Sequence, residues 1–326
     1  MTAYLALAAE NGITVFLYPI DGWTIGRSFS PGTIEQCLTY GTMVAERFRD
    51  LPNIVWMSGG DYFPEADEPA LGSDVDHCID AMMRGIRTAG DSRPFSIQLG
   101  YPKSISTDNP YWAERVSWNF VYSYLPTYRA VLSAYARTPV VPAIFGEGNY
   151  EGENNYPDTP ATTAKTLRQQ MLWALTSGAA GAFYGSDDWE FHDGWEARLD
   201  TKAVTQLHRL HDVFGQLPWW SLVPDTTSTL VTAGRGIAVT DDAPVDVLDN
   251  DYVTAARSPD GRLAVIYLPG AHTITVDRTA LAAGSQAVWV DPANGANRTV
   301  PMADTFTTPG PNADGDNDWL LLITAS

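Results

Sequence analysis

The chain has 326 residues and a formal net charge of −19 at pH 7. This charge disfavours nucleic acid as a partner, because the protein would repel its phosphates. The sequence has no apolar run of roughly 18 residues that could cross a bilayer, so we expect no membrane partner. Motifs for phosphate-loop, serine-hydrolase and zinc-protease chemistry are also missing, and we therefore predict no cofactor and no metal. The sequence leaves the oligomeric state open.

Strand-like and helix-like segments alternate over the first two thirds of the chain. Runs typical of buried strands cover residues 14–20, 53–58, 94–99, 118–124, 139–145 and 179–184. Helical patterns cover residues 2–10, 33–49, 74–89, 127–136, 162–177 and 201–214. This α/β alternation predicts a parallel sheet built from right-handed βαβ units. A closed (β/α)8 barrel needs eight strands, so the six visible strands fit either a TIM-type barrel truncated at its N-terminus or an open sheet.

The pattern changes after Phe214, where a junction rich in proline and tryptophan leads into short β-type runs. These runs cover residues 236–240, 252–257, 263–268, 273–276, 286–290 and 319–324. They predict a small all-β sandwich, and hence two domains: a (β/α) barrel at residues 1–218 and a β-sandwich at 219–326. We expect Trp219 and Trp220 to pack tightly at the junction. The acidic stretch 314–318 lacks the glutamate and the spacing of a calcium loop, so we expect a hairpin turn there.

The two cysteines, Cys37 and Cys78, lie in predicted helices. Their number neither demands nor excludes a disulfide, and no Cys-x-x-Cys or Cys/His spacing indicates a metal site. We expect both to be buried free thiols.

Two carboxylates follow predicted strands directly. Asp61 comes after Gly59 and Gly60 at the end of one strand, and Glu147 comes after Gly146 at the end of another. Because the carboxyl ends of parallel strands share one rim, these side chains can serve one site. Glycoside hydrolysis needs such a pair, with one group protonating the leaving oxygen and the other attacking or activating water. The alternative for Asp61 is a cap on a following helix or turn.

Further candidates surround this rim. Additional acids are Asp21, Glu151, Asp187, Asp188 and Glu190. Glu151 competes with Glu147 for the role of nucleophile, and we prefer Glu147 because it ends its strand directly. The residues predicted to line a sugar site are Trp23, Tyr62, Tyr150, Glu151, Tyr184 and Trp189. Aromatic faces pair with the apolar faces of a saccharide, although each of these side chains could equally be packing at the mouth of a barrel.

Several stretches resemble one known family. They are YGTMVAERFRDLPNIVWMSGGDYFP (40–64), LPWWSLVPD (217–225), YLPG (267–270), VWVDPANG (288–295) and DWLLLI (318–323). Together they resemble the apiosidase-like glycoside hydrolases of family 140, whose second domain is often labelled as collagen-binding. The resemblance implies a retaining (β/α)8 barrel with Asp61 as general acid/base and Glu147 as nucleophile on the seventh strand. Counted in this way, the six strands are strands three to eight, and the first two are absent from this sequence.

These observations predict a retaining glycoside hydrolase that cleaves O-glycosidic bonds of a plant or microbial polysaccharide. A furanoside such as apiose is one candidate for the sugar, and a carbohydrate is the expected partner. The alternative is a non-catalytic carbohydrate-binding or adhesion protein derived from an incomplete barrel. The resemblance implies a secreted or periplasmic protein, while the first residues show no signal-peptide pattern; the compartment stays open.

Overall fold

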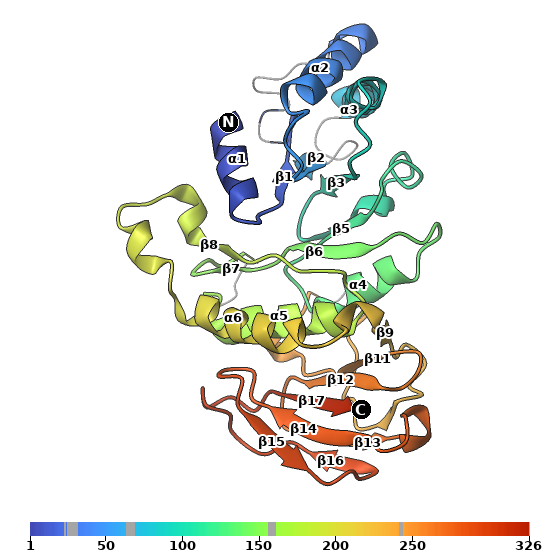
Figure 1. Ribbon diagram of the computed structural model, residues 1–326, viewed down its shortest axis with the longest axis vertical. Coiled ribbons are helices and arrows are strands. Elements are labelled where there is room, and N and C mark those ends of the chain that lie inside the picture. Colours follow the sequence, from blue (N-terminus) through green and yellow to red (C-terminus); the bar gives the residue numbers. More distant parts are fainter. Residues whose placement is uncertain (23, 25–31, 63–68, 156–160, 241–243, 326) are drawn as a thin grey trace. The chain divides into compact units, whose positions relative to one another are not determined.

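The computed structural model describes residues 1–22, 24, 32–62, 69–155, 161–240 and 244–325 (Figure 1). The chain forms two compact units, Met1–Tyr122 and Ser123–Ser326. The domain boundary predicted at residue 218 stays a prediction. Within the described ranges, no helix is both long enough and apolar enough to cross a membrane.

The first unit is a mixed α/β body with parallel strands. Its elements are α1 (Thr2–Glu10), β1 (Val15–Leu17), α2 (Ile34–Arg47), β2 (Ile54–Tyr62), α3 (Pro69–Thr88), β3 (Phe95–Leu99), β4 (Lys103–Ile105) and β5 (Asn119–Ser123). The strands β1, β2 and β3 form a parallel sheet in that order. All five residues of β3 are buried, as expected of a parallel strand that is covered on both faces. This confirms the α/β pattern predicted for the region.

A disulfide joins α2 to α3, and the prediction of two free thiols is therefore wrong. Cys37 and Cys78 are bonded, with their Cα atoms 5.3 Å apart. The two helices lie side by side (Figure 1) and approach closely, because Gly41 of α2 faces the backbone carbonyl of Met82 in α3. Spacing along the sequence could not reveal this pairing, since it depends on how the two helices pack.

The helical part of the second unit contains the remaining catalytic candidates. Its elements are α4 (Tyr128–Tyr135), β6 (Ala143–Glu147), β7 (Tyr150–Glu151), α5 (Ala164–Thr176), β8 (Gly185–Ser186) and α6 (Lys202–Gly215). The predicted strand 179–184 needs correction: only Ala182 forms a bridge, with Phe145. The segment follows β6 for a few residues, with the amide of Ala180 donating to the carbonyl of Ala143. It then leaves β6, and β8 pairs with β7.

The C-terminal part is built from two antiparallel sheets. Its strands are β9 (Val223–Pro224), β10 (Val231–Ala233), β11 (Thr254–Arg257), β12 (Leu263–Leu268), β13 (Thr273–Val276), β14 (Gln286–Val290), β15 (Asn297–Val300), β16 (Thr305–Thr307) and β17 (Trp319–Thr324). One sheet has the order β15-β14-β17-β12-β11-β9, and the other has the order β10-β13-β16. The predicted strand at 236–240 is absent, because those residues form irregular chain.

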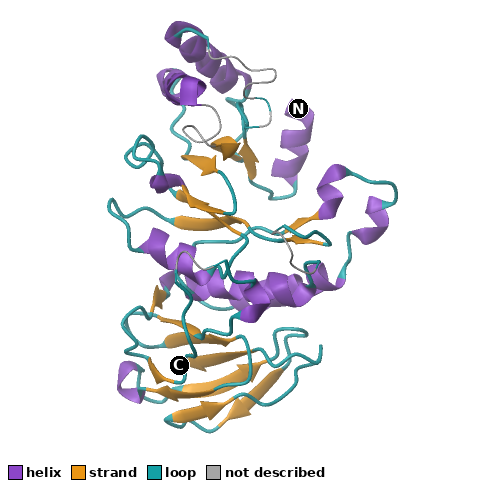
Figure 2. Cartoon of the chain, turned by 180° about the vertical axis from the view of Figure 1, so that it is seen from behind, coloured by secondary structure: helices purple, strands orange, loops and turns teal. Residues whose placement is uncertain are grey.

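Both faces of the larger sheet are buried. In β12, Ala264, Ile266 and Leu268 face the core shared with the smaller sheet. Val265 and Tyr267 face the opposite way, into a core with the helices α4, α5 and α6. This period of two explains why β12 is apolar throughout. Figure 2 shows the helices covering one face of this sheet.

The junction is looser than predicted. Trp219 packs against the helix-facing core of the sheet, whereas Trp220 is 73% exposed and contacts the Trp219 ring only edge-on. The expectation of a tightly packed tryptophan pair is therefore wrong for Trp220.

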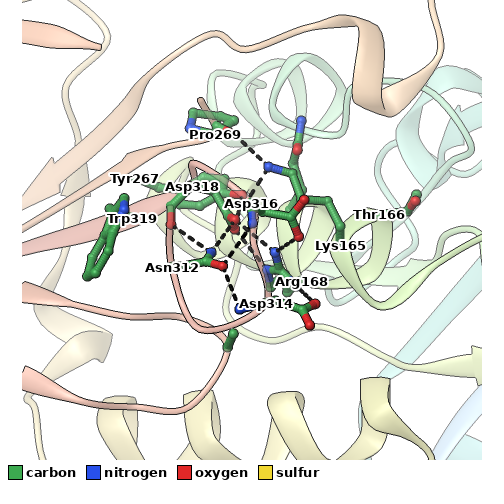
Figure 3. Close-up of polar contacts among 12 residues, drawn as sticks. Lys165, Thr166, Arg168, Tyr267, Pro269, Asn312, Asp314, Asp316, Asp318 and Trp319 are labelled. Atoms are coloured by element: carbon green, nitrogen blue, oxygen red, sulfur yellow. Dashed lines mark hydrogen bonds and ion pairs between the residues drawn. The ribbon is translucent and has the colours of Figure 1, made fainter. Parts of the chain in front are cut away.

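A buried arginine holds the acidic stretch 314–318 against α5 (Figure 3). The Arg168 guanidinium is fully buried and donates two hydrogen bonds, of 2.9 and 2.8 Å, to the carboxylate of Asp318. It also pairs with Asp314 and Asp316. Burial alone would lower the pKa of Arg168, but the hydrogen bonds to Asp318 outweigh it and raise that pKa. The predicted hairpin turn is thus a turn closed around an internal cation.

Candidate active site

Asp61 lies at an irregular end of β2. Gly59 and Gly60 both have φ of +87°, and Asp61 follows with φ of +53°. The pairing of β2 with β3 shifts register between Gly59 and Tyr62. A Cβ on Gly59 would lie 2.1 Å from the carbonyl oxygen of Gln98, so only glycine fits beside β3. Aspartate tolerates the left-handed region better than most residues. Left-handed residues other than glycine are nevertheless uncommon in strands, and they cluster at functional sites.

Two opposing effects act on the pKa of the Asp61 carboxyl. The surrounding protein desolvates it, which raises its pKa above the ordinary value. A hydrogen bond from Tyr122 acts in the opposite direction and is the smaller effect. The residue is still accessible to solvent. A carboxylic acid that is accessible and keeps its proton to higher pH suits a proton donor.

Two of the other candidates in the first unit contact other residues of the protein, and one lies outside the described residues. Tyr62 is buried in the core, and its hydroxyl donates to Asp76 at 3.2 Å. The backbone of Asp21 forms a parallel β-bridge with Gly59. The Asp21 carboxylate accepts a hydrogen bond from the amide of Thr24 at 3.0 Å. Trp23 lies outside the described residues. The predicted sugar contacts of Tyr62 and Trp23 therefore stay predictions.

Glu147 is the last residue of β6, where the sequence placed it. The hydroxyl of Tyr150 donates to its Oε1 at 2.8 Å, and the hydroxyl of Tyr124 donates to the same oxygen at 3.3 Å. Just beyond the strand, the amide of Asn149 donates to the side chain of Gln170 in α5 at 3.0 Å. The strand, the two phenols and this anchor fix the direction of the Glu147 carboxylate.

Glu151 is held differently from Glu147. Its Oε2 accepts from Tyr184 at 2.6 Å and from Thr201 at 2.7 Å. Thr201 is also the N-cap of α6, because its hydroxyl accepts from the amide of Val204. Burial and the bond to Glu151 raise the pKa of Tyr184 to about 12, so this phenol remains a donor. Glu151 thus ties β7 and residue 184 to the start of α6.

The segment after β8 contains the remaining predicted residues. The indole of Trp189 donates to Glu153 at 2.8 Å, and Arg198 pairs with Asp187 and Asp188. Glu190 lies 2.9 Å from the ring of His192. The two aspartates are therefore bound by a neighbouring cation within the segment.

Sequence reasoning predicted Tyr150 as a site residue but missed two other phenols that contact the carboxylates. Tyr122 bonds Asp61, and Tyr124 bonds Glu147. Both tyrosines lie within the last three residues of the predicted strand 118–124. Polar groups at that end of a parallel strand were the available signal.

Two family models match the chain. The model described as "Apiosidase-like, catalytic domain" matches residues 1–221, which is more than half of the sequence. The model described as "Putative collagen-binding domain of a collagenase" matches residues 241–324. Both carboxylates, Asp61 and Glu147, lie within the first match. No curated protein matches the sequence.

Several solved structures have a similar fold. A structure described as a glycoside hydrolase has a TM-score of 0.80 at 19% identity, over 99% of this chain and 75% of that chain. A glycoside hydrolase family 5 protein from Bacteroides vulgatus ATCC 8482 has a TM-score of 0.78 at 19% identity, over 98% of this chain and 73% of that chain. A GH27 β-L-arabinopyranosidase from Geobacillus stearothermophilus, in a complex with arabinose, has a TM-score of 0.51 at 9% identity, over 100% and 78%. At these identities the likeness concerns the fold.

Proposed function

Because the chain belongs to the apiosidase-like family, it is a glycosidase, and we propose that it acts by a retaining mechanism with two carboxylates. The match of the catalytic-domain model over residues 1–221 carries this proposal. It favours an enzyme over the alternative of a carbohydrate-binding protein without activity. The proposal includes a (β/α)8 barrel as the architecture of the catalytic region, supported by fold similarity to glycoside hydrolases.

In this proposal Asp61 is the general acid/base. As an acid it protonates the glycosidic oxygen while the bond between the anomeric carbon and that oxygen breaks. As a base it then takes a proton from the water that attacks the intermediate. The raised pKa of Asp61 supports the first role, because the carboxyl must hold a proton when the substrate binds. Its left-handed backbone conformation is a second supporting observation.

Glu147 is the proposed nucleophile. It attacks the anomeric carbon and forms a glycosyl ester, which water then hydrolyses. An attacking carboxylate has to be held in one direction, and the hydroxyls of Tyr150 and Tyr124 provide this by bonding Oε1. Glu151 is less suited, because Tyr184 and Thr201 engage it in joining β7 to α6.

The proposed substrate is a plant or microbial polysaccharide, with apiose or another furanoside as the candidate sugar. Tyr150, Tyr184 and Trp189 remain proposed contacts for the sugar, together with Trp23 and Tyr62. The Cys37–Cys78 disulfide supports an oxidising compartment, as expected of an exported enzyme.

The stereochemistry of the product tests this mechanism. A panel of 4-nitrophenyl furanosides and pyranosides, with the apioside included, identifies a substrate, and ¹H NMR then follows the anomer released first. We expect retention, and we expect Glu147→Ala to abolish turnover and to recover it with azide as a glycosyl azide of inverted configuration. Glu46→Ala, which changes an exposed carboxylate on α2, is the control. Release of the inverted anomer, or full activity of Glu147→Ala, would contradict the proposal.

A further inference from the structure

The side chain of Gln170, in the middle of α5, is buried although it carries two polar groups. It is 1% exposed. Its Oε1 accepts a hydrogen bond from the amide of Asn149, and its Nε2 donates one to the carbonyl of Ser123, both at 3.0 Å. A buried amide destabilises the fold unless its polar atoms are hydrogen-bonded. Gln170 therefore connects two segments, the end of β5 and the chain that follows β6.

Both of these segments carry a phenol that contacts Glu147. The carbonyl of Ser123 belongs to the peptide group that leads into Tyr124, and Asn149 directly precedes Tyr150. The hydroxyls of the two tyrosines donate to the same oxygen, Oε1 of Glu147, at 3.3 and 2.8 Å. One buried glutamine thus fixes the backbone beside both residues that orient the proposed nucleophile.

Close packing supports this arrangement. A Cβ on Gly148 would lie 2.9 Å from Oε1 of Gln170 and 2.4 Å from the ring of Phe145, so the chain after β6 lies directly against α5. The helix itself is held by Leu172 and Trp173, which are fully buried in the core that α5 shares with the larger sheet. Side chains in such a close-packed core have little freedom to move. Gln170 therefore projects from a rigid support.

We propose that Gln170 is a positioning residue for the nucleophile, which acts through Tyr124 and Tyr150 to hold the Glu147 carboxylate in the direction that attack requires. This inference rests on the proposed function, because it assigns Gln170 to the nucleophile of that reaction. A misplacement of about 1 Å can lower the rate of an enzymatic reaction by about 10²-fold. Loss of the two bonds of Gln170 would release the backbone beside both phenols, and the carboxylate would lose its fixed direction.

The neighbouring residue Gln169 offers a matched control. It is also 1% exposed, and its Nε2 donates at 2.9 Å to the carbonyls of Val247 and Asn250. These carbonyls lie in the segment before β11. Gln169→Met and Gln170→Met each remove two buried hydrogen bonds and retain an unbranched side chain of similar size. A difference in activity between the two variants therefore reports which segments the bonds hold.

The test measures steady-state kinetics of the full chain on the 4-nitrophenyl glycoside that serves as substrate. We expect kcat of Gln170→Met to fall by about 10- to 100-fold while KM stays close to the wild-type value, because the change affects attack more than binding. Gln169→Met should keep the wild-type kcat. Urea unfolding should show similarly lowered midpoints for both variants, since each leaves two buried backbone groups without a partner.

Gln170→Glu is a second variant, which keeps the shape of the side chain if Gln170→Met fails to fold. When protonated, its carboxyl can accept from Asn149 and donate to Ser123 as the amide does, whereas the ionised form cannot donate. We therefore expect the ratio of its kcat to the wild-type kcat to fall as the pH rises. A ratio that does not change with pH would count against the role of the bond to Ser123.

A double-mutant cycle tests whether Gln170 acts through the two phenols. When Tyr124→Phe and Tyr150→Phe are both present, Gln170→Met should lower kcat little further, because the hydroxyls that transmit its effect are gone. Additive losses, or equal losses of kcat in Gln169→Met and Gln170→Met, would overturn the inference. Wild-type kcat in Gln170→Met, with Glu147→Ala inactive, would overturn this inference alone. Full activity of Glu147→Ala would overturn the proposed function itself.

Discussion

The two units hold their candidate carboxylates by different means. In the first unit the backbone places Asp61, through the left-handed residues Gly59 and Gly60 and the close approach of β3. In the second unit, side chains place Glu147, since a regular strand ends at it and two phenols bond one of its oxygens. The difference suits the proposed roles. A proton donor needs a desolvated carboxyl with few hydrogen bonds that stabilise its charged form. A nucleophile needs a charged carboxylate that is held in one direction.

The same contrast appears in how each unit joins its elements. A covalent bond links α2 to α3 through Cys37 and Cys78 in the first unit. In the second unit, Arg168 on α5 binds the acidic turn through Asp318, Asp314 and Asp316. The first arrangement depends on the redox state of the surroundings and the second depends on pH. Each unit should therefore respond to a different perturbation.

The largest expected effect concerns the chemistry of Asp61. With Asp61→Ala, turnover of glycosides with poor leaving groups should fall by about 10²–10⁴-fold, because no group protonates the departing oxygen. A 2,4-dinitrophenyl glycoside needs no such proton, so formation of its glycosyl intermediate should be nearly as fast as in the wild type. Steady-state and burst kinetics on both substrates measure the difference.

The pH profile separates this role from a structural one. Wild-type kcat/KM should fall as the pH rises through the raised pKa of Asp61, since the acid form is the active one. Asp61→Ala should lose this decline at high pH. Equal losses on both leaving groups, with the decline kept, would assign the general acid to another residue.

Part of this picture was predictable from the sequence. The glycines before Asp61 and the strand before Glu147 indicated two carboxylates at strand ends, and the structure places both residues there. Local patterns also predicted the helices well, because apolar periodicity and caps such as Thr33 and Thr201 are local signals.

The rest depends on tertiary contacts. The bond between Cys37 and Cys78 follows from the packing of two helices. Residues 180–183 run beside β6, and the chain then pairs with β7 from Gly185 onward. Arg168 could be predicted to face outward as a charged helix residue. It is buried because three aspartates, far away in sequence, surround its guanidinium.

The next effect is on the stability of the second unit. Arg168→Met keeps the volume of the side chain but leaves Asp318 buried without its main cation. We expect the free energy of unfolding to fall by about 3–5 kcal/mol, as for other broken buried pairs. Arg209→Met is the matched control on α6, because Arg209 is exposed and its nearest contact with Asp212 is 3.9 Å. That variant should stay within about 0.5 kcal/mol of the wild type in urea unfolding.

Acid should reduce the difference between Arg168→Met and the wild type. Burial alone would raise the pKa of Asp318, but hydrogen bonds from Arg168 and its charge lower it below the ordinary value. The stability from this pair is therefore present above the unfolded pKa of about 3.9 and is lost as the pH falls through the lower, folded value. Unfolding curves of Arg168→Met and the wild type should differ at neutral pH and should converge only as the pH falls below the lowered pKa of Asp318. A constant difference would mean that packing around Arg168, and not its charge, stabilises the turn.

The smallest effect tests whether the backbone places Asp61. Gly59 and Gly90 share a φ of +87°, but a Cβ on Gly90 has no atom within 4 Å, while one on Gly59 meets the carbonyl of Gln98. Gly90→Ala should lose about 1–2 kcal/mol of stability from the left-handed conformation, measured by urea unfolding. Gly59→Ala should lose more, because its Cβ also clashes with the backbone of Gln98. Only Gly59→Ala should also lower kcat, because the clash moves the turn that carries Asp61. If both variants keep the same kcat, the position of Asp61 does not depend on the glycine turn, and the contrast between the two carboxylates fails on that side.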